Sequence, residues 1–166
     1  MNKVNFLGNP IELIGNKVEV GDLAPNFELL SNDLSKVNLD TYKGQIKLIS
    51  VVPSIDTEVC DQQTRYFNEQ ASNINNVKII TISTDLPFAQ KRWCNASGLQ
   101  NVLTLSDHLD VSFGKSYGVL MSELRLLARA IFVVDSNDTV VYVEYVDEVT
   151  NHPNYKLAFD SLKTAK

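Results

Sequence analysis

Short apolar runs separated by longer amphipathic segments form the pattern of the middle of the chain. Residues 46–52 are mostly apolar and the run stops at Pro53, as expected of a buried central strand. Residues 77–83 form a second run of the same kind. Between the two runs, residues 58 to about 73 mix apolar and polar side chains and predict a helix. The centre of the chain is therefore expected to form a strand, a helix and a second strand.

The second half of the chain continues this alternation and ends in a helix. Residues 128–134 and 139–146 predict two strands that a polar turn joins as a hairpin, and residues 153–163 predict an amphipathic helix. Weaker patterns predict short strands at 27–30, 37–39 and 102–105, helices at 87–98 and 107–116, and an N-terminal hairpin within residues 1–20. Together these elements predict an α/β fold, a mixed sheet covered on both faces, in one domain that spans residues 1–166.

Composition and charge narrow the class of protein. The chain has 166 residues, of which 44% are hydrophobic and 21% charged, and these values are ordinary for a globular domain. The net charge of −5 argues against non-specific binding to a nucleic-acid backbone. No apolar run has the length of a membrane span, and the first ten residues lack the apolar core of a signal peptide. We expect a cytoplasmic protein with neither a nucleic-acid nor a membrane partner.

The cysteines carry the clearest chemical signal. There are two, Cys60 and Cys94, which is too few for a disulfide scaffold. Cys60 comes after the first buried strand, where the predicted helix begins. If Thr57 caps that helix, the Cys60 sulfur lies beside unpaired backbone N–H groups, and the positive end of the helix dipole favours a thiolate. The polar surroundings argue against a cysteine that only packs in the core, but on spacing alone both interpretations stay open.

The segment around Cys60 resembles the active site of a known family. Pro53, Thr57 and Cys60 match Pro-x-x-x-Thr-x-x-Cys, the signature of the peroxiredoxins, and the string Pro-Ser-Ile-Asp-Thr-x-Val-Cys resembles the bacterial thiol peroxidase subgroup. Further segments that agree with this subgroup are residues 6–10, 83–94, 117–119, 128–130 and 146–150. The resemblance covers essentially the whole chain. It is weakest at residues 121–127, where a Gly-Pro-Leu segment is expected and Met-Ser-Glu-Leu-Arg-Leu-Leu stands instead.

The resemblance implies a fold and a set of roles. The fold would be thioredoxin-like with an added N-terminal hairpin, and Cys60 would attack a hydroperoxide and become a sulfenic acid. Thr57, the Cys60 backbone N–H and Arg129 would donate to the peroxide oxygens, while Pro53 would shield the sulfur from water. Arg129 could also point to solvent from an edge strand. The apolar run at 130–134 instead predicts a buried strand, where a charged group needs a partner.

The resemblance also gives Cys94 and the partners of the protein. Without it, Cys94 is better interpreted as a packing residue beside Phe88 and Trp93, because no Cys-x-x-Cys spacing is present. With it, Cys94 is the resolving cysteine, which closes an intramolecular disulfide that thioredoxin reduces. The resemblance further implies a homodimer, and we expect no cofactor and no metal.

Three other kinds of function are alternatives to the peroxidase. A zinc site would need ligands at close spacing, and neither the cysteines nor the histidines are so paired. A cysteine hydrolase would use Cys60 with His108 or His152, and activity on esters or amides would indicate it. A peroxide-sensing relay protein would oxidise Cys60 without efficient turnover. Catalytic peroxide reduction with a thioredoxin system separates the enzyme from the sensor.

Overall fold

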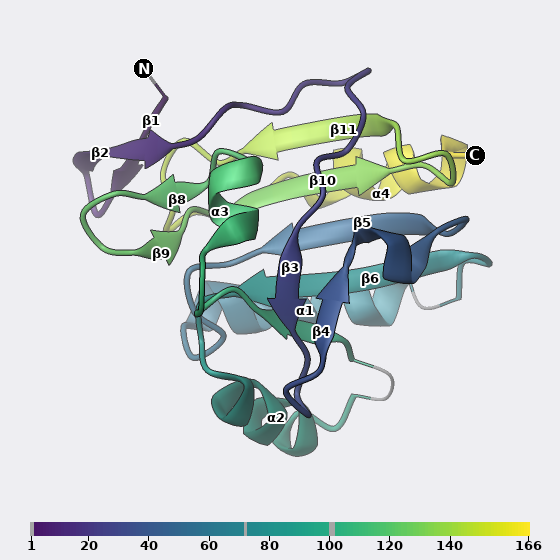
Figure 1. The fold of residues 1–166 in the computed structure, drawn as a ribbon, viewed down its shortest axis with the longest axis horizontal. Coiled ribbons are helices and arrows are strands. Elements are labelled where there is room, and N and C mark those ends of the chain that lie inside the picture. Colours follow the sequence, from purple (N-terminus) through teal and green to yellow (C-terminus); the bar gives the residue numbers. More distant parts are fainter. Residues whose placement is uncertain (1, 72, 100–101) are drawn as a thin grey trace.

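A seven-stranded mixed sheet forms the centre of the computed structural model, which describes residues 2–71, 73–99 and 102–166 (Figure 1). The strand order is β11-β10-β5-β6-β7-β3-β4, in which β5, β6 and β7 are parallel and the remaining pairs are antiparallel. The strands are β3 (Glu28–Leu30), β4 (Lys36–Asn38), β5 (Ile46–Val51), β6 (Val77–Ser83), β7 (Thr104–Ser106), β10 (Ala130–Val134) and β11 (Val140–Tyr145). The sheet confirms the predicted central strands and the predicted hairpin of β10 and β11.

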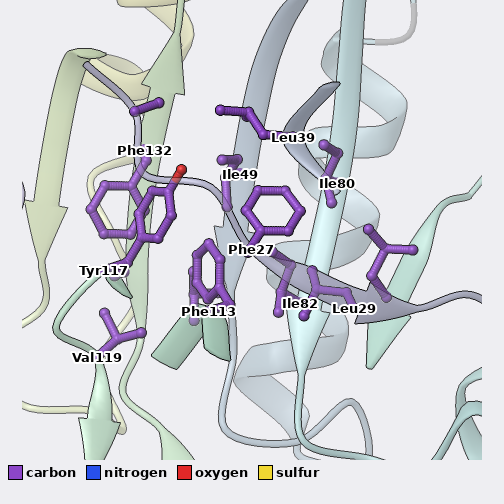
Figure 2. Close-up of a cluster of buried hydrophobic side chains, with 14 of the residues drawn as sticks. Phe27, Leu29, Leu39, Ile49, Ile80, Ile82, Phe113, Tyr117, Val119 and Phe132 are labelled. Carbon is purple, nitrogen blue, oxygen red and sulfur yellow. The ribbon is translucent and has the colours of Figure 1, made fainter. Parts of the chain in front are cut away.

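The two faces of the sheet bury different sets of side chains. Helices α1 (Glu58–Ala71) and α4 (Tyr155–Thr164) cover one face, where Phe67 packs with Ile131 and Val133 of β10. The intervening residue Phe132 belongs to the cluster on the other face, because side chains alternate along a strand. Figure 2 shows that cluster, in which Phe132 lies beside the ring of Tyr117, and their centroids are 5.1 Å apart. The same cluster is completed by α3 (Ser112–Ser116) and the short 3₁₀-helix η1 (Leu39–Tyr42).

A small second sheet confirms the predicted N-terminal hairpin. Its order is β1-β2-β8-β9, built from β1 (Lys3–Phe6), β2 (Asn9–Ile14), β8 (Leu120–Met121) and β9 (Leu126–Leu127). The Glu148 carboxylate accepts from the backbone N–H groups of Leu7 and Gly8, each at 3.0 Å, and holds the hairpin turn against the rest of the molecule. The atypical segment 121–127 runs from the end of β8 through a turn to β9, and its first residue, Met121, pairs with Leu13 of the hairpin.

The third predicted helix is wrong in its first half. Residues 107–111 do not form the start of a helix, and α3 begins only at Ser112. The Asp107 carboxylate accepts from the N–H groups of Phe113 and Gly114, at 3.2 and 2.8 Å, so it caps a helix that starts later. Val111 adopts a left-handed conformation (φ 46°), which breaks the helical path in between.

Other boundaries differ by only a few residues. The helix predicted at 58–73 ends at Ala71, and Ser72 lies outside the described residues. The helix predicted at 87–98 is α2 (Pro87–Ala96), which packs on β7. The strand predicted from residue 128 begins at Ala130, so Arg129 immediately precedes it.

Candidate active site

Cys60 lies at the start of α1, where the chain leaves the central sheet. Strand β5 ends at Val51, and residues 52–57 form a loop before the helix begins at Glu58. The Asp61 N–H donates to the Thr57 carbonyl at 2.9 Å, so Thr57 immediately precedes the helix and Cys60 is its third residue. The Cys60 side chain is completely buried. A sulfur at this position lies close to the backbone N–H groups that the first helical turn leaves unpaired.

Arg129, the residue before β10, reaches this sulfur. Strand β10 runs antiparallel to β5 and pairs Ala130 with Val51, so the residue before β10 lies beside the loop that follows β5. Arg129 is only 2% exposed, and its Nη2 donates to Cys60 Sγ at 3.3 Å. The buried position is the one that the apolar run after Arg129 indicated. A cation that is 69 positions away in the sequence thus contacts the cysteine.

The other two nitrogens of the guanidinium also donate hydrogen bonds. Arg129 Nε donates to the Val149 carbonyl at 2.8 Å, and Nη1 donates to Gln63 Oε1 at 2.9 Å. Gln63 is itself fixed, because its Nε2 donates to Ser50 Oγ at 2.7 Å. Gln63 was not among the residues predicted from the sequence. Its signal is the spacing, since a residue three positions after Cys60 lies on the same face of a helix.

Thr57 and Pro53 line a pocket whose wall also includes Arg129, the residue that contacts the buried sulfur. The pocket has a volume of about 220 Å³, and most of its wall is apolar. Its lining residues are Phe6, Pro53, Ser54, Thr57, Glu58, Val59, Leu126, Arg129, Val149 and Thr150. The Thr57 hydroxyl donates to the Ser54 carbonyl at 3.2 Å. Its oxygen therefore offers lone pairs as an acceptor, and this differs from the donor role that the resemblance implied.

Cys94 lies near the end of α2, in contact with a different part of the sheet. Its Sγ is 3.4 Å from Thr104 Oγ1 on β7, and Asn32 Nδ2 lies 3.8 Å from the same sulfur. Thr104 Oγ1 also donates to Asn32 Oδ1 at 3.0 Å, which closes a ring of three polar side chains. Both cysteines are free thiols. The structure therefore does not join Cys60 and Cys94, and each has its own hydrogen-bond partners.

Comparison with known proteins identifies the family. The model of the family described as Redoxin matches residues 19–158. The chain belongs to the Redoxin family. It is 62% identical over 165 residues to a thiol peroxidase of Halalkalibacterium halodurans, with 99% of each chain covered. It is 60% identical over 163 residues to a thiol peroxidase of Staphylococcus haemolyticus, covering 98% of this chain and 99% of the relative.

Two solved structures share this fold. A peroxiredoxin-like protein from Aquifex aeolicus superposes with a TM-score of 0.90 at 38% identity, covering 98% of this chain and 97% of the other. A thiol peroxidase from Chromobacterium violaceum, at 23% identity, shares the fold with a TM-score of 0.85 and coverages of 98% and 95%. The thioredoxin-like fold and the resemblance to the thiol peroxidases are both confirmed.

The histidines of this Redoxin chain do not join Cys60. His152 is exposed and its Nδ1 lies 2.7 Å from the Tyr155 hydroxyl, and the Cys60 sulfur has its hydrogen bond from Arg129 rather than from a histidine. The geometry thus gives no support to a cysteine hydrolase. Within residues 2–71, 73–99 and 102–166, no three His, Cys, Asp or Glu side chains are grouped so as to hold a metal ion. Nor does any helix in these ranges have the length and apolar character needed to cross a membrane.

Proposed function

We propose that this protein is a thiol-dependent peroxidase in which Cys60 reduces hydrogen peroxide and organic hydroperoxides. The observation that carries the proposal is the hydrogen bond from Arg129 Nη2 to Cys60 Sγ at 3.3 Å. The bond lies at the first turn of α1, and Arg129 also lines the pocket. The relatives named thiol peroxidase, at 56 to 62% identity over nearly the full chain, support it.

The chemistry follows from where charge develops. The Cys60 thiolate attacks the terminal oxygen of the hydroperoxide, an S–O bond forms and the O–O bond breaks. The leaving alkoxide or hydroxide takes up a proton, so the products are a sulfenic acid and an alcohol or water. Arg129 and the Cys60 backbone N–H would stabilise the negative charge as it moves from sulfur to oxygen. Thr57 would accept a hydrogen bond from the peroxide O–H, and buried Pro53 would keep water from the sulfur.

The pocket supports organic hydroperoxides as substrates. Phe6 of the N-terminal hairpin, Leu126 of β9 and Val149 supply apolar surface next to Arg129. An alkyl or aryl substituent buries apolar area there, which hydrogen peroxide cannot do. Both substrates would react at the same sulfur, and the substituent would mainly affect the Michaelis constant.

Resolution would use Cys94 and an external dithiol. The Cys94 thiolate would attack the sulfenic sulfur and release the oxygen as water, which leaves an intramolecular disulfide. A dithiol protein of the thioredoxin type would reduce this disulfide by exchange and become oxidised itself. A disulfide needs Cα atoms within about 7 Å of each other. Since Cys94 is held by Asn32 and Thr104, we propose that α2 must move before the bond can form.

The proposed setting of the enzyme comes from the resemblance. We propose that it works in the cytoplasm, where a dithiol reductant is available, and as a homodimer. Sedimentation equilibrium of the reduced protein tests the homodimer, and a mass equal to one chain at micromolar concentration would contradict it.

The peroxidase activity is tested by a thiol count and a mass measurement before and after one equivalent of peroxide. The wild-type protein should lose both thiols. Cys60→Ser should keep its remaining thiol and lose turnover, because serine preserves the shape but not the nucleophile. Cys94→Ser is the matched control, and it should gain one oxygen atom on Cys60. Near wild-type turnover in Cys60→Ser would rule out the proposal, and a single oxidation without turnover with thioredoxin and its reductase would indicate a sensor.

A further inference from the structure

We infer that Asp85 is a positioning residue for peroxide reduction, which fixes the loop of residues 53–57 and through it the hydroxyl of Thr57. Asp85 follows β6 and precedes α2, so it belongs to neither the loop nor the helix of Cys60. The inference rests on the proposed function, because it assumes that Cys60 reacts and that Thr57 contacts the peroxide.

The Asp85 carboxylate holds two consecutive residues of the loop. Oδ1 accepts from Ser54 Oγ at 2.8 Å, and Oδ2 accepts from the Ile55 backbone N–H at 2.8 Å. Oδ2 also accepts from Ser83 Oγ at 2.6 Å, which anchors the carboxylate to the end of β6. Both oxygens of Asp85 thus act as acceptors, and hydrogen bonds to a carboxylate are stronger than those between neutral groups.

The contact continues from Ser54 to Thr57. The Ser54 carbonyl accepts from the Thr57 hydroxyl at 3.2 Å and from the Thr57 N–H at 3.3 Å. The Ser54 hydroxyl, while donating to Asp85, also accepts from the Asp56 N–H at 3.2 Å. A change in the position of Ser54 therefore alters both the backbone before α1 and the direction of the Thr57 hydroxyl.

Few other contacts could fix the loop as firmly. The Val52 N–H donates to the Ile82 carbonyl at 3.0 Å and continues the sheet pairing by one residue. Residues 53–57 also donate hydrogen bonds to a side chain outside the loop. Among the residues that the structure describes, that side chain is Asp85. Thr57 itself is exposed and lies on the pocket wall, so packing alone does not set its rotamer. The lone pairs of Thr57 are aimed by this chain of hydrogen bonds.

The substitution Asp85→Asn separates this role from the bulk of the side chain. Asparagine is nearly isosteric, but its Nδ2 is a donor and would face either the Ser54 hydroxyl or the Ile55 N–H. Loss of one charge-assisted hydrogen bond to the loop corresponds to about a tenfold change in rate if it is felt fully in the transition state. Ser54→Ala removes only the Oγ contact and should give a smaller loss.

A double-mutant cycle with Thr57→Val tests the inference. All variants are made in a Cys94→Ser background, and the rate constant for addition of one oxygen atom to Cys60 is measured by quenched flow and mass spectrometry. Asp85→Asn should lower this rate constant about tenfold when Thr57 is present, and less than about twofold when Thr57 is already valine. A residue that only stabilised the fold would lower the rate equally in both backgrounds.

The controls distinguish failure of the inference from failure of the proposed function. Asp135→Asn is the matched control. The Asp135 carboxylate also accepts from two backbone N–H groups of a turn, those of Asn137 and Thr139, but it is not part of the loop before Cys60. This variant should leave the rate unchanged. Multiplying effects of Asp85→Asn and Thr57→Val, or no effect of Asp85→Asn, would overturn the role of Asp85. If Asp85→Asn does not fold, Ser54→Ala carries the same cycle. No loss in Thr57→Val alone would instead remove Thr57 from the proposed reaction.

Discussion

Trp93 Nε1 donates a hydrogen bond to Asp61 Oδ1 at 2.8 Å, which joins the residue before Cys94 to the residue after Cys60. Arg65 strengthens this contact, because its Nε donates to Asp61 Oδ2 at 2.9 Å and its Nη1 donates to the Ser97 carbonyl at 2.7 Å. The Arg65 guanidinium also lies 5.5 Å from the Trp93 ring centroid. These polar contacts connect α1 with α2, and they involve partly exposed groups. Their loss costs less free energy than unpacking a buried apolar core.

Loss of this contact should speed disulfide formation. Trp93→Phe keeps an aromatic ring but removes the indole N–H, so the closed position of α2 loses about 1 kcal/mol. If α2 must move before Cys94 reacts, the rate of disulfide formation after one equivalent of peroxide should rise by roughly fivefold. Quenching by alkylation, followed by mass spectrometry, measures this rate. Phe88→Leu, at an exposed position of the same helix, is the control that should change nothing. An unchanged or slower rate in Trp93→Phe would show that the contact does not restrain α2.

Arg129→Lys should slow the reaction of Cys60 with peroxide by about tenfold or more. Lysine keeps the positive charge but lacks the planar fork of donors that contacts Cys60, Gln63 and the Val149 carbonyl together. The free energy of unfolding should change by less than the activation free energy, because lysine keeps the positive charge. The rate is measured at limiting peroxide and saturating reductant, and the stability by urea unfolding. Arg125→Lys changes an exposed arginine that binds the His108 and Leu109 carbonyls, and it serves as the control. An unchanged rate constant in Arg129→Lys would remove Arg129 from the site.

The sequence predicted the elements of this molecule better than it predicted their contacts. Apolar runs identified β5, β6 and β10 because a strand buried on both faces leaves a strong local signal. The pairing of Arg129 with Cys60 is not local, and it was anticipated only through the family motif and the need of a buried charge for a partner. Its cause in the structure is the antiparallel register that pairs Ala130 with Val51.

Two of the contacts that the sequence did not predict join distant segments. Asp85 meets Ser54, and Asp61 meets Trp93, across 31 and 32 positions. Local periodicity carries no information on such pairs. The segment 107–111 was assigned to a helix for a related reason. The Asp107 side chain accepts from the N–H groups six and seven positions later, and helix propensity carries no information on such a contact.

Asp107 should make the stability depend on pH in the acidic range. Burial raises the pKa of its carboxyl to about 6 from 3.8, although the Gly114 and Phe113 N–H groups favour the ionised form. Between these values the unfolded chain has released the proton and the folded protein retains it. The free energy of unfolding therefore falls as pH rises from about 4 to about 6, by roughly 2–3 kcal/mol for this group, and stays level above.

Asp107→Asn provides the comparison for this pH effect, because asparagine does not titrate. The free energy of unfolding of the wild type minus that of the variant should decrease across the pH window and then remain constant. Urea unfolding at closely spaced pH values measures both proteins under the same conditions. A difference that rises with pH would indicate that the folded protein holds Asp107 ionised throughout.

Hydrogen exchange should locate the segment that opens when the enzyme is oxidised. Helix α2 has ten residues and few buried side chains of its own, Pro87 and Gln90 among them, so it depends on its contacts to stay folded. A Cys60–Cys94 disulfide would pull Cys94 from Thr104 and Asn32 and would separate Trp93 from Asp61. Amide protection at residues 86–98 should therefore fall on oxidation by peroxide and recover after reduction by thioredoxin, while that of β5 and β10 in the central sheet stays constant. Cys94→Ser, which cannot form the disulfide, should keep its protection after the same treatment. Equal exchange at residues 86–98 in the reduced and the disulfide forms would mean that the two cysteines meet without opening of α2.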